Sequence, residues 1–391
     1  MLMKLKHSLH NLKWLNLSVL ICLLLNVGYQ YYKYQKFISH TQFITAKIVN
    51  QYKKKNYWVL KLKNKNIEFY TTTKDDLKDI LNKNVEVGVI TKKISFWDYI
   101  TKFYAPTFNL GILETPKYEK FIEKQHSDKK IANIFKALFF GDSLYYDTRQ
   151  KLSALGISHL FALSGLHLAI ISGVLYLLLT PIYNIFLPPY RNRNICLGIT
   201  ILIILFLYLW FVNFPPSLVR SFIMESLVFV FAYFLRDILS FKLLFLAIIV
   251  SLVLFPNFIV SIGFFLSVMG VFLIFLFFKY FKLNFINGLI ILPIYLYIMM
   301  LPIAHYFFGN FNIYQLLSPF VTILFNVLYP IEIILHLIGL GNMFDEVIKS
   351  YLSLGDKYIT FYTPFWFFYG YLIILGYLAS KPLHNQNHYR L

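Results

Sequence analysis

Residues 157–179 read ISHLFALSGLHLAIISGVLYLLL, an apolar run with polar side chains gathered near its beginning. Its length is close to the ~20 residues that a helix needs to cross the hydrocarbon core of a bilayer. Similar apolar runs lie at 195–213, 217–235, 242–255, 258–278, 285–303, 314–335 and 364–380. The series predicts a polytopic α-helical membrane protein whose transmembrane bundle covers residues 156–380, followed by a tail over 381–391.

The composition supports this fold class. The chain has 391 residues, of which 58% are hydrophobic and only 14% are charged, a balance that excludes an ordinary soluble domain and a disordered chain. The net charge of +19 lies mostly outside the apolar runs and indicates anionic partners, lipid or nucleic acid. An AT-rich genome also produces a composition rich in Lys, Asn, Ile, Phe and Tyr. The positive charge alone therefore does not identify the partner. Cys22 and Cys196 both fall in apolar runs, and we predict neither a disulfide nor a metal site, and no cofactor.

The connections between the runs predict the orientation. Every second connection carries positive charge, and the intervening ones around 213–216, 255–257 and 305–312 have no Lys or Arg. The charged connections contain Arg191, Arg193, Arg236, Lys242, Lys279 and Lys282. Under the positive-inside rule these connections face the cytoplasm of a bacterial inner membrane. Residues 1–35 predict an anchor helix with a cytoplasmic N-terminus, retained because no small-residue cleavage site follows it.

Residues 36–95 change to a polar, Lys-rich pattern with strand periodicity. Alternation over 42–49, 57–63, 66–72 and 85–91 predicts a small β domain, which lies outside the cytoplasm because one span precedes it. Its cations and aromatic rings resemble the surface that proteins use to bind single-stranded nucleic acid. The alternative is an ordinary solvated face. The candidate DNA-binding residues are Lys53, Lys54, Lys55, Tyr57, Lys61, Lys63 and Tyr70.

Residues 96–155 predict interfacial amphipathic helices. Apolar residues recur at helical spacing over 127–140, and Gly141 ends the pattern. A second helix over 143–155 carries Asp147 and Lys151 at a spacing that favours an ion pair. Such helices lie on a membrane or against another helix.

Four polar side chains lie within the predicted helix 157–179. On a continuous helix of about 100° per residue, His159, Leu163 and His167 fall within a sector of about 80°, and Ser164 adjoins His167. Polar groups at membrane depth normally face a bundle interior or an aqueous path. The residues therefore tie helices together by hydrogen bonds or line a pore, and a metal site is disfavoured because two His alone lack the other ligands.

The motifs in this part of the chain resemble the ComEC family of competence proteins. The resemblance is carried by Gly-Ile-Ser-His-Leu and Leu-Ser-Gly-Leu-His at 156–167, by the segment 137–141, and by Pro-Ser-Leu-Val-Arg-Ser-Phe-Ile-Met at 216–224. It implies an inner-membrane channel that passes single-stranded DNA during natural transformation, with an OB-like β domain. Many members of this family carry a C-terminal metallo-β-lactamase-like domain with a His-x-His-x-Asp-His cluster. The sequence shows no such cluster and so resembles a short form of the family without that domain.

The resemblance implies a DNA path through the bundle. Arg220 is the best cation for a phosphate, because a guanidinium binds phosphate with two parallel hydrogen bonds; the alternative is an arginine whose head snorkels to the interface. Glu225 should pair with another helix or be protonated. The candidate path residues are Ser158, His159, Ser164, Gly165, His167, Arg220 and Glu225.

The sequence also predicts partners and rival functions. It has no G-x-x-x-x-G-K-[ST] loop, so we expect a cytoplasmic ATPase or single-strand-binding proteins to pull the strand. A separate periplasmic DNA receptor should deliver the strand. Assembly of the chain into a homo-oligomer is compatible with this role. We predict no enzymatic activity. One rival is a transporter or flippase of anionic lipid-linked sugars. The other is an intramembrane serine hydrolase with Ser164 as the nucleophile and His305 or His336 as the base.

Overall fold

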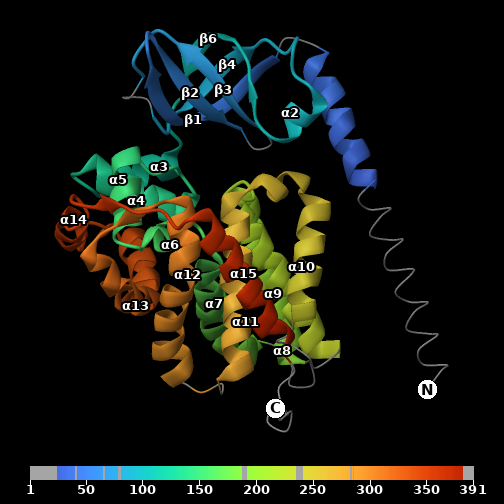
Figure 1. The fold of residues 1–391 in the computed structure, drawn as a ribbon, viewed down its shortest axis with the longest axis vertical. Coiled ribbons are helices and arrows are strands. Elements are labelled where there is room, and N and C mark those ends of the chain that lie inside the picture. Colours follow the sequence, from blue (N-terminus) through green and yellow to red (C-terminus); the bar gives the residue numbers. More distant parts are fainter. Residues whose placement is uncertain are drawn as a thin grey trace. The chain divides into compact units, whose positions relative to one another are not determined.

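The structure is a computed structural model that describes residues 24–39, 42–64, 67–77, 81–186, 192–234, 241–281, 284 and 286–381. The chain divides into two compact units, one of Met1–Lys117 with Ala247–Ser261 and one of Tyr118–Leu246 with Ile262–Leu391. Figure 1 shows a β-sheet in the first unit and helices throughout the second. Residues 24–38 are helical, and the rest of the predicted anchor and nearly all of the tail lie outside the described residues.

The first unit contains a six-stranded sheet in the order β5-β3-β2-β1-β4-β6. The strands are β1 (Gln42–Lys54), β2 (Tyr57–Lys63), β3 (Glu68–Thr73), β4 (Asn84–Val89), β5 (Phe103–Tyr104) and β6 (Thr107–Ile112). The long β1 pairs with both β2 and β4, and its register shifts between Ile48 and Asn50. Alternate side chains such as Ile48, Leu62 and Phe69 form a buried core.

The sheet continues beyond residue 95, where the sequence had predicted its end. Helix α2 (Phe96–Ile100) starts at Ser95 with a capping box to Asp98, and β5 and β6 then complete the sheet. The reason for the difference is local. Strand β5 has two residues, and β6 is mostly exposed, so neither shows the buried alternation by which strands are recognised.

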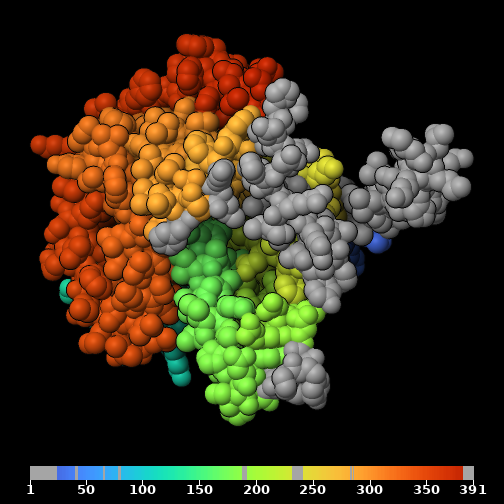
Figure 2. Space-filling view, turned by 90° about the horizontal axis from the view of Figure 1, so that it is seen from below, coloured from blue at the N-terminus to red at the C-terminus, as the bar shows by residue number. Residues whose placement is uncertain are grey.

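The second unit is helical, and Figure 2 views it end on, with residues coloured green gathered on one side and those coloured orange to red on the other. The longer helices are α7 (Gly165–Phe186), α8 (Arg193–Phe211), α9 (Pro216–Phe234), α11 (Ile262–Tyr280), α12 (Leu292–Phe307), α13 (Ser318–Leu337) and α15 (Phe365–Ser380). The shorter ones are α3 (Lys117–Glu123), α4 (Lys129–Phe140), α5 (Tyr146–Ala154), α6 (Ser158–Phe161) and α14 (Asp345–Ser353). Helix α10 (Phe241–Leu254) is divided between the two units.

Several helices match the predicted membrane spans. Among the described residues, five helical segments are long and apolar enough to cross a membrane: Gly165–Phe186, Arg193–Phe211, Ile262–Tyr280, Asn287–Phe307 and Ile313–Leu337. Helices α10 and α15 are apolar but shorter. Most of the apolar side chains on these segments are not buried inside the protein, as expected for helices whose surroundings are lipid.

The predicted amphipathic helix at 127–140 is confirmed as α4. Asp128 caps its start by accepting the backbone N–H of Lys130, and Gly141 ends it in the left-handed region at φ 76°. Its apolar face packs in one core with residues of α13 and α14, so α4 lies against other helices. The predicted pair of Asp147 with Lys151 is wrong. Within the described residues, Asp147 forms its ion pair with Lys130 and Lys151 with Asp356.

Candidate functional site

Residues 157–179 do not form one continuous helix. Helix α6 ends at Phe161, Ala162 has extended backbone angles (φ −99°, ψ 130°), and α7 begins at Gly165. The predicted alignment of His159, Leu163 and His167 on one helical face is therefore wrong, because the spacing of 100° per residue does not hold across the break. The residues that decide the local structure are Ser164 and Gly165, which start a new helix.

His167 joins the two helices on either side of the break by hydrogen bonds. Its Nε2 lies 3.0 Å from the carbonyl oxygen of Leu160, which can only accept, so Nε2 carries the hydrogen. Its Nδ1 then accepts from the backbone N–H of Ser164 at 3.1 Å and from the Ser164 hydroxyl at 2.9 Å. The ring is fully buried. This arrangement supports the helix-tying role of His167 more than the pore-lining one, because both ring nitrogens already have partners within the chain.

The groups of the rival hydrolase are not brought together. His305 lies near the Phe361 carbonyl oxygen and the Gln315 amide, at 3.2 and 3.3 Å. His336 contacts His126, not Ser164. The hydroxyl of Ser164 does lie against a histidine, His167, but that contact belongs to the start of α7. The predicted pairing of Ser164 with His305 or His336 therefore has no support in the described residues.

The other two polar residues of the motif lie on α6. His159 is exposed, and its Nε2 lies 3.3 Å from the Thr322 hydroxyl of α13. The Ser158 hydroxyl is buried and has no hydrogen-bond partner among the described residues. Both are thus separated by the break from Ser164 and His167.

Arg220 lies at the centre of a buried polar cluster in the second unit. Its side chain is only 3% exposed, so the alternative of a head group snorkelling into water is wrong. Nε donates to the Ser267 hydroxyl of α11 at 2.8 Å, and Nη2 donates to the Ser221 hydroxyl at 2.7 Å. Nη1 is buried without a partner, and no carboxylate of the described chain forms an ion pair with the guanidinium.

Gly165 lets α9 approach the break. A Cβ atom at this position would lie 2.6 Å from the Ser221 hydroxyl and 3.3 Å from Nη2 of Arg220. One turn earlier on α9, the Ser217 hydroxyl donates to the carbonyl oxygen of Leu163 at 2.5 Å. The start of α7 and the first turns of α9 are therefore joined by polar contacts, and Arg220 lies beside them.

Glu225 pairs with another helix, as one of its two predicted alternatives required. Its Oε1 lies 2.5 Å from the Ser172 hydroxyl of α7. That hydroxyl is also 2.9 Å from the carbonyl oxygen of Leu168 in its own helix. Since a hydroxyl has one hydrogen and the Leu168 carbonyl can only accept, a protonated Glu225 donating to Ser172 satisfies both contacts.

The candidate DNA-binding residues of the sheet do not all share one face. Cross-strand partners point to the same side of a sheet, and Lys54 pairs with Tyr57 while Lys61 pairs with Tyr70. The outer face thus carries Lys54, Tyr57, Lys61, Lys63 and Tyr70. Glu68 on the same face forms ion pairs with Lys61 and Lys102 at 3.0 and 3.5 Å and so reduces the positive charge.

Lys53 and Lys55 lie apart from that face. Lys53 pairs across the sheet with Trp58, on the core side, and its Nζ lies 5.6 Å from the Trp58 ring centre. Lys55 is in the turn between β1 and β2 with φ 39°. The predicted single surface of these residues is therefore divided, because alternate strand residues point to opposite faces.

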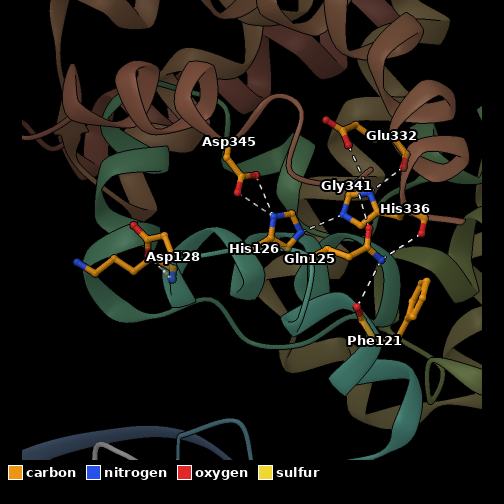
Figure 3. Close-up of polar contacts among 9 residues, drawn as sticks. Phe121, Gln125, His126, Asp128, Glu332, His336, Gly341 and Asp345 are labelled. Carbon is orange, nitrogen blue, oxygen red and sulfur yellow. Dashed lines mark hydrogen bonds and ion pairs between the residues drawn. The ribbon is translucent and has the colours of Figure 1, made fainter. Parts of the chain in front are cut away.

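A buried network of two histidines and two carboxylates escaped the sequence analysis (Figure 3). His126 precedes α4, Glu332 and His336 lie on α13, and Asp345 begins α14. All of these side chains are buried, and the His126 ring stacks on Phe135 at 4.8 Å between ring centres. Burial lowers the pKa of His126, and Asp345 opposes that effect. No local pattern points to this network, since His126 and His336 are 210 residues apart.

The comparison with known families settles the family. Residues 138–377, well over half of the chain, match the family model described as Competence protein. The chain belongs to the Competence protein family. This match includes α6, α7, α9 and the C-terminal end of α4. With the five apolar helical segments it makes the chain a multi-pass membrane protein with a role in competence and DNA uptake. No significant match was found among curated proteins or solved structures.

Proposed function

We propose that this competence protein is a channel component that carries incoming single-stranded DNA across the cytoplasmic membrane during natural transformation. The observation that carries the proposal is the buried guanidinium of Arg220, which has one free nitrogen, two serine partners and no carboxylate among the described residues. Burying a cation without a counter-charge costs free energy of folding, and such cations in membrane proteins usually have a functional role.

A passing phosphodiester supplies the missing charge. A strand in a membrane conduit needs groups that replace water and counterions at each phosphate, without binding so tightly that the strand stops. A single guanidinium surrounded by the neutral hydroxyls of Ser221 and Ser267 suits this need, since it offers one charge-assisted contact. The remaining candidate path residues, Ser158 and His159 above all, add polarity without further fixed charge.

The test is transformation of cells that carry Arg220→Gln, which keeps an amide donor for the serines but removes the charge. We expect transformation to fall by about tenfold to a hundredfold, the factor that a lost charge-assisted contact of about 1.5–3 kcal/mol gives. Membrane abundance should stay at the parental level. Arg149→Gln is the matched control, because Arg149 is an exposed arginine of the same unit. Parental transformation by the Arg220 variant would reject the proposal.

The placement of the chain is part of the same proposal. The N-terminus lies in the cytoplasm of a bacterium, the bundle crosses the inner membrane, and the β unit lies on the outer side. These assignments are supported by the alternation of positive charge between the predicted spans. An OB-like fold for the β unit is supported by a small sheet built on a long, bulged β1 that pairs with two neighbours.

The proposed partners follow from the role. Single-stranded DNA and the bilayer contact the chain directly, a periplasmic DNA receptor delivers the strand, and a cytoplasmic ATPase or single-strand-binding proteins draw it inward. The chain itself is a conduit and not an enzyme in this proposal. This division of labour is supported by the absence of a G-x-x-x-x-G-K-[ST] loop from the sequence.

A further inference from the structure

The contact between His126 and His336 constrains their protons. Nδ1 of His126 lies 2.9 and 3.1 Å from the two carboxylate oxygens of Asp345. Nδ1 of His336 lies 2.7 Å from the backbone carbonyl oxygen of Glu332, which can only accept. His336 therefore carries a hydrogen on Nδ1, and its Nε2 is an acceptor whenever the ring is neutral. The two Nε2 atoms lie 3.1 Å apart, which is a hydrogen-bond distance.

A hydrogen bond at this contact needs one proton and no more. Two neutral rings with hydrogens on Nδ1 place two lone pairs against each other, and two imidazolium rings place two N–H groups against each other. We infer that His126 and His336 form a proton-binding site that holds a single proton between their Nε2 atoms. This proton ties the segment before α4 to α13 and, through Asp345, to α14 (Figure 3).

The charges around the pair balance this proton. With an ionised Asp345, a protonated His126 and a neutral His336, the three side chains sum to zero. The sum is the same if the proton moves to Asp345 and His126 donates from Nε2 alone, so the proton count does not depend on where the charge rests. Loss of the proton leaves a net negative charge in a buried site, together with two opposed lone pairs.

Few other groups act on the pair. The charged neighbours of His126 are Asp345, His336 and Glu332, and Oε2 of Glu332 lies 3.4 Å from Nδ1 of His336. Helix α4 contributes the uncharged rings of Phe135 and Phe139. The uncharged Gln125 joins the His336 carbonyl oxygen to the Gly341 N–H, at 3.1 and 2.9 Å. Aromatic and amide groups therefore surround the pair, and Asp345 and Glu332 are its charged neighbours.

The inference goes beyond the proposed role in DNA passage and does not rest on it. The favourable coupling between the two rings exists only while the shared proton is present, so it is lost when rising pH removes that proton. At that point the two Nε2 lone pairs oppose each other, and α13 loses its imidazole contact with the segment before α4, while the Nδ1–H of His126 still donates to Asp345. The site is a proton-sensitive latch between parts of the chain that are far apart in sequence.

A double-mutant cycle on the full chain tests the latch. The melting temperature is measured for the parent, His126→Gln, His336→Gln and the double variant at about pH 4.5 and about pH 8.5. The acidic point lies well below the ordinary histidine pKa because burial lowers the pKa of His126. We expect the double variant to lose clearly less than the sum of the single losses at the acidic pH, and additive losses at the alkaline pH. A cycle of His305→Gln with His336→Gln is the control and should be additive at both. Additivity of the first cycle at both pH values overturns the inference.

A second measurement needs no variant. In the parental protein with ¹⁵N-labelled histidine, reconstituted in liposomes, solid-state NMR should show at acidic pH a correlation between two ring nitrogens across a shared hydrogen. The correlation should disappear at alkaline pH. Absence of the correlation at acidic pH overturns the inference. So does elemental analysis that finds a tightly held divalent metal ion in stoichiometric amount, because the ion would then take the place of the proton between the Nε2 atoms.

Discussion

The Arg220 cluster and the His126–His336 pair are both buried in the helical unit, but they treat charge in opposite ways. Arg220 has hydroxyl partners and no carboxylate among the described residues, so its charge is not balanced there. In the histidine pair, Asp345 balances the charge of the shared proton within the chain. In our proposals, an external anion completes the Arg220 cluster, whereas the histidine pair is complete within the chain and holds elements together.

The largest expected effects are opposite for the two sites. Asp345→Asn removes the counter-charge of a buried histidine and should destabilise the protein by about 3 kcal/mol, the lower end of the cost of breaking a buried pair. Its transformation per folded molecule should stay near the parental level. Arg220→Gln should show the reverse pattern, with little change in stability and a large loss of transformation. Melting curves and transformation assays on both variants check this; the same pattern in both would remove the distinction.

A smaller effect is expected from Gly165→Ala, which sharpens the account of the Arg220 cluster. The new Cβ would lie 2.6 Å from the Ser221 hydroxyl and 3.3 Å from Nη2 of Arg220, so these side chains or their helix must shift, at a typical cost of about 1–3 kcal/mol. Transformation should fall because the guanidinium moves with its neighbours. Gly173→Ala on the same helix is the matched control, since no atom lies within 4 Å of its Cβ position. Equal melting temperatures and equal transformation for the two variants would contradict the close packing.

How far the sequence predicts these sites depends on the range of the interactions. Arg220 could be found because a cation interrupts an apolar run, and the end of α4 could be found because Gly141 acts locally. The break before Gly165 could not, since the apolar pattern continues through it. His126 and His336 could not be linked, because their contact depends on the folding of segments 210 residues apart.

The smallest effect concerns the sheet, where neighbouring lysines offer a matched pair. Lys54 lies on the outer face and Lys53 on the core side. If the outer face contacts the strand, Lys54→Gln should reduce the slope of log binding constant against log salt by about 0.7, the value for one lost phosphate contact on a single strand. Lys53→Gln should leave the slope unchanged. Anisotropy titrations of the purified full chain with a labelled oligonucleotide measure both slopes; identical slopes would assign the lysines to a solvated surface.

The most direct measurement of the central claim is capture of the strand beside Arg220 during uptake. In the Ser267→Cys variant, a thiol replaces the hydroxyl that contacts the guanidinium. Cells with this variant are given DNA that carries a thiol-reactive group on its backbone. The same substitution at Ser226, which lies on α9 and bonds to the Phe222 carbonyl oxygen, serves as the comparison. We predict a covalent adduct with the strand at position 267 and little or none at 226. Import of the strand at the parental rate, with no adduct at 267, would contradict a DNA path past Arg220.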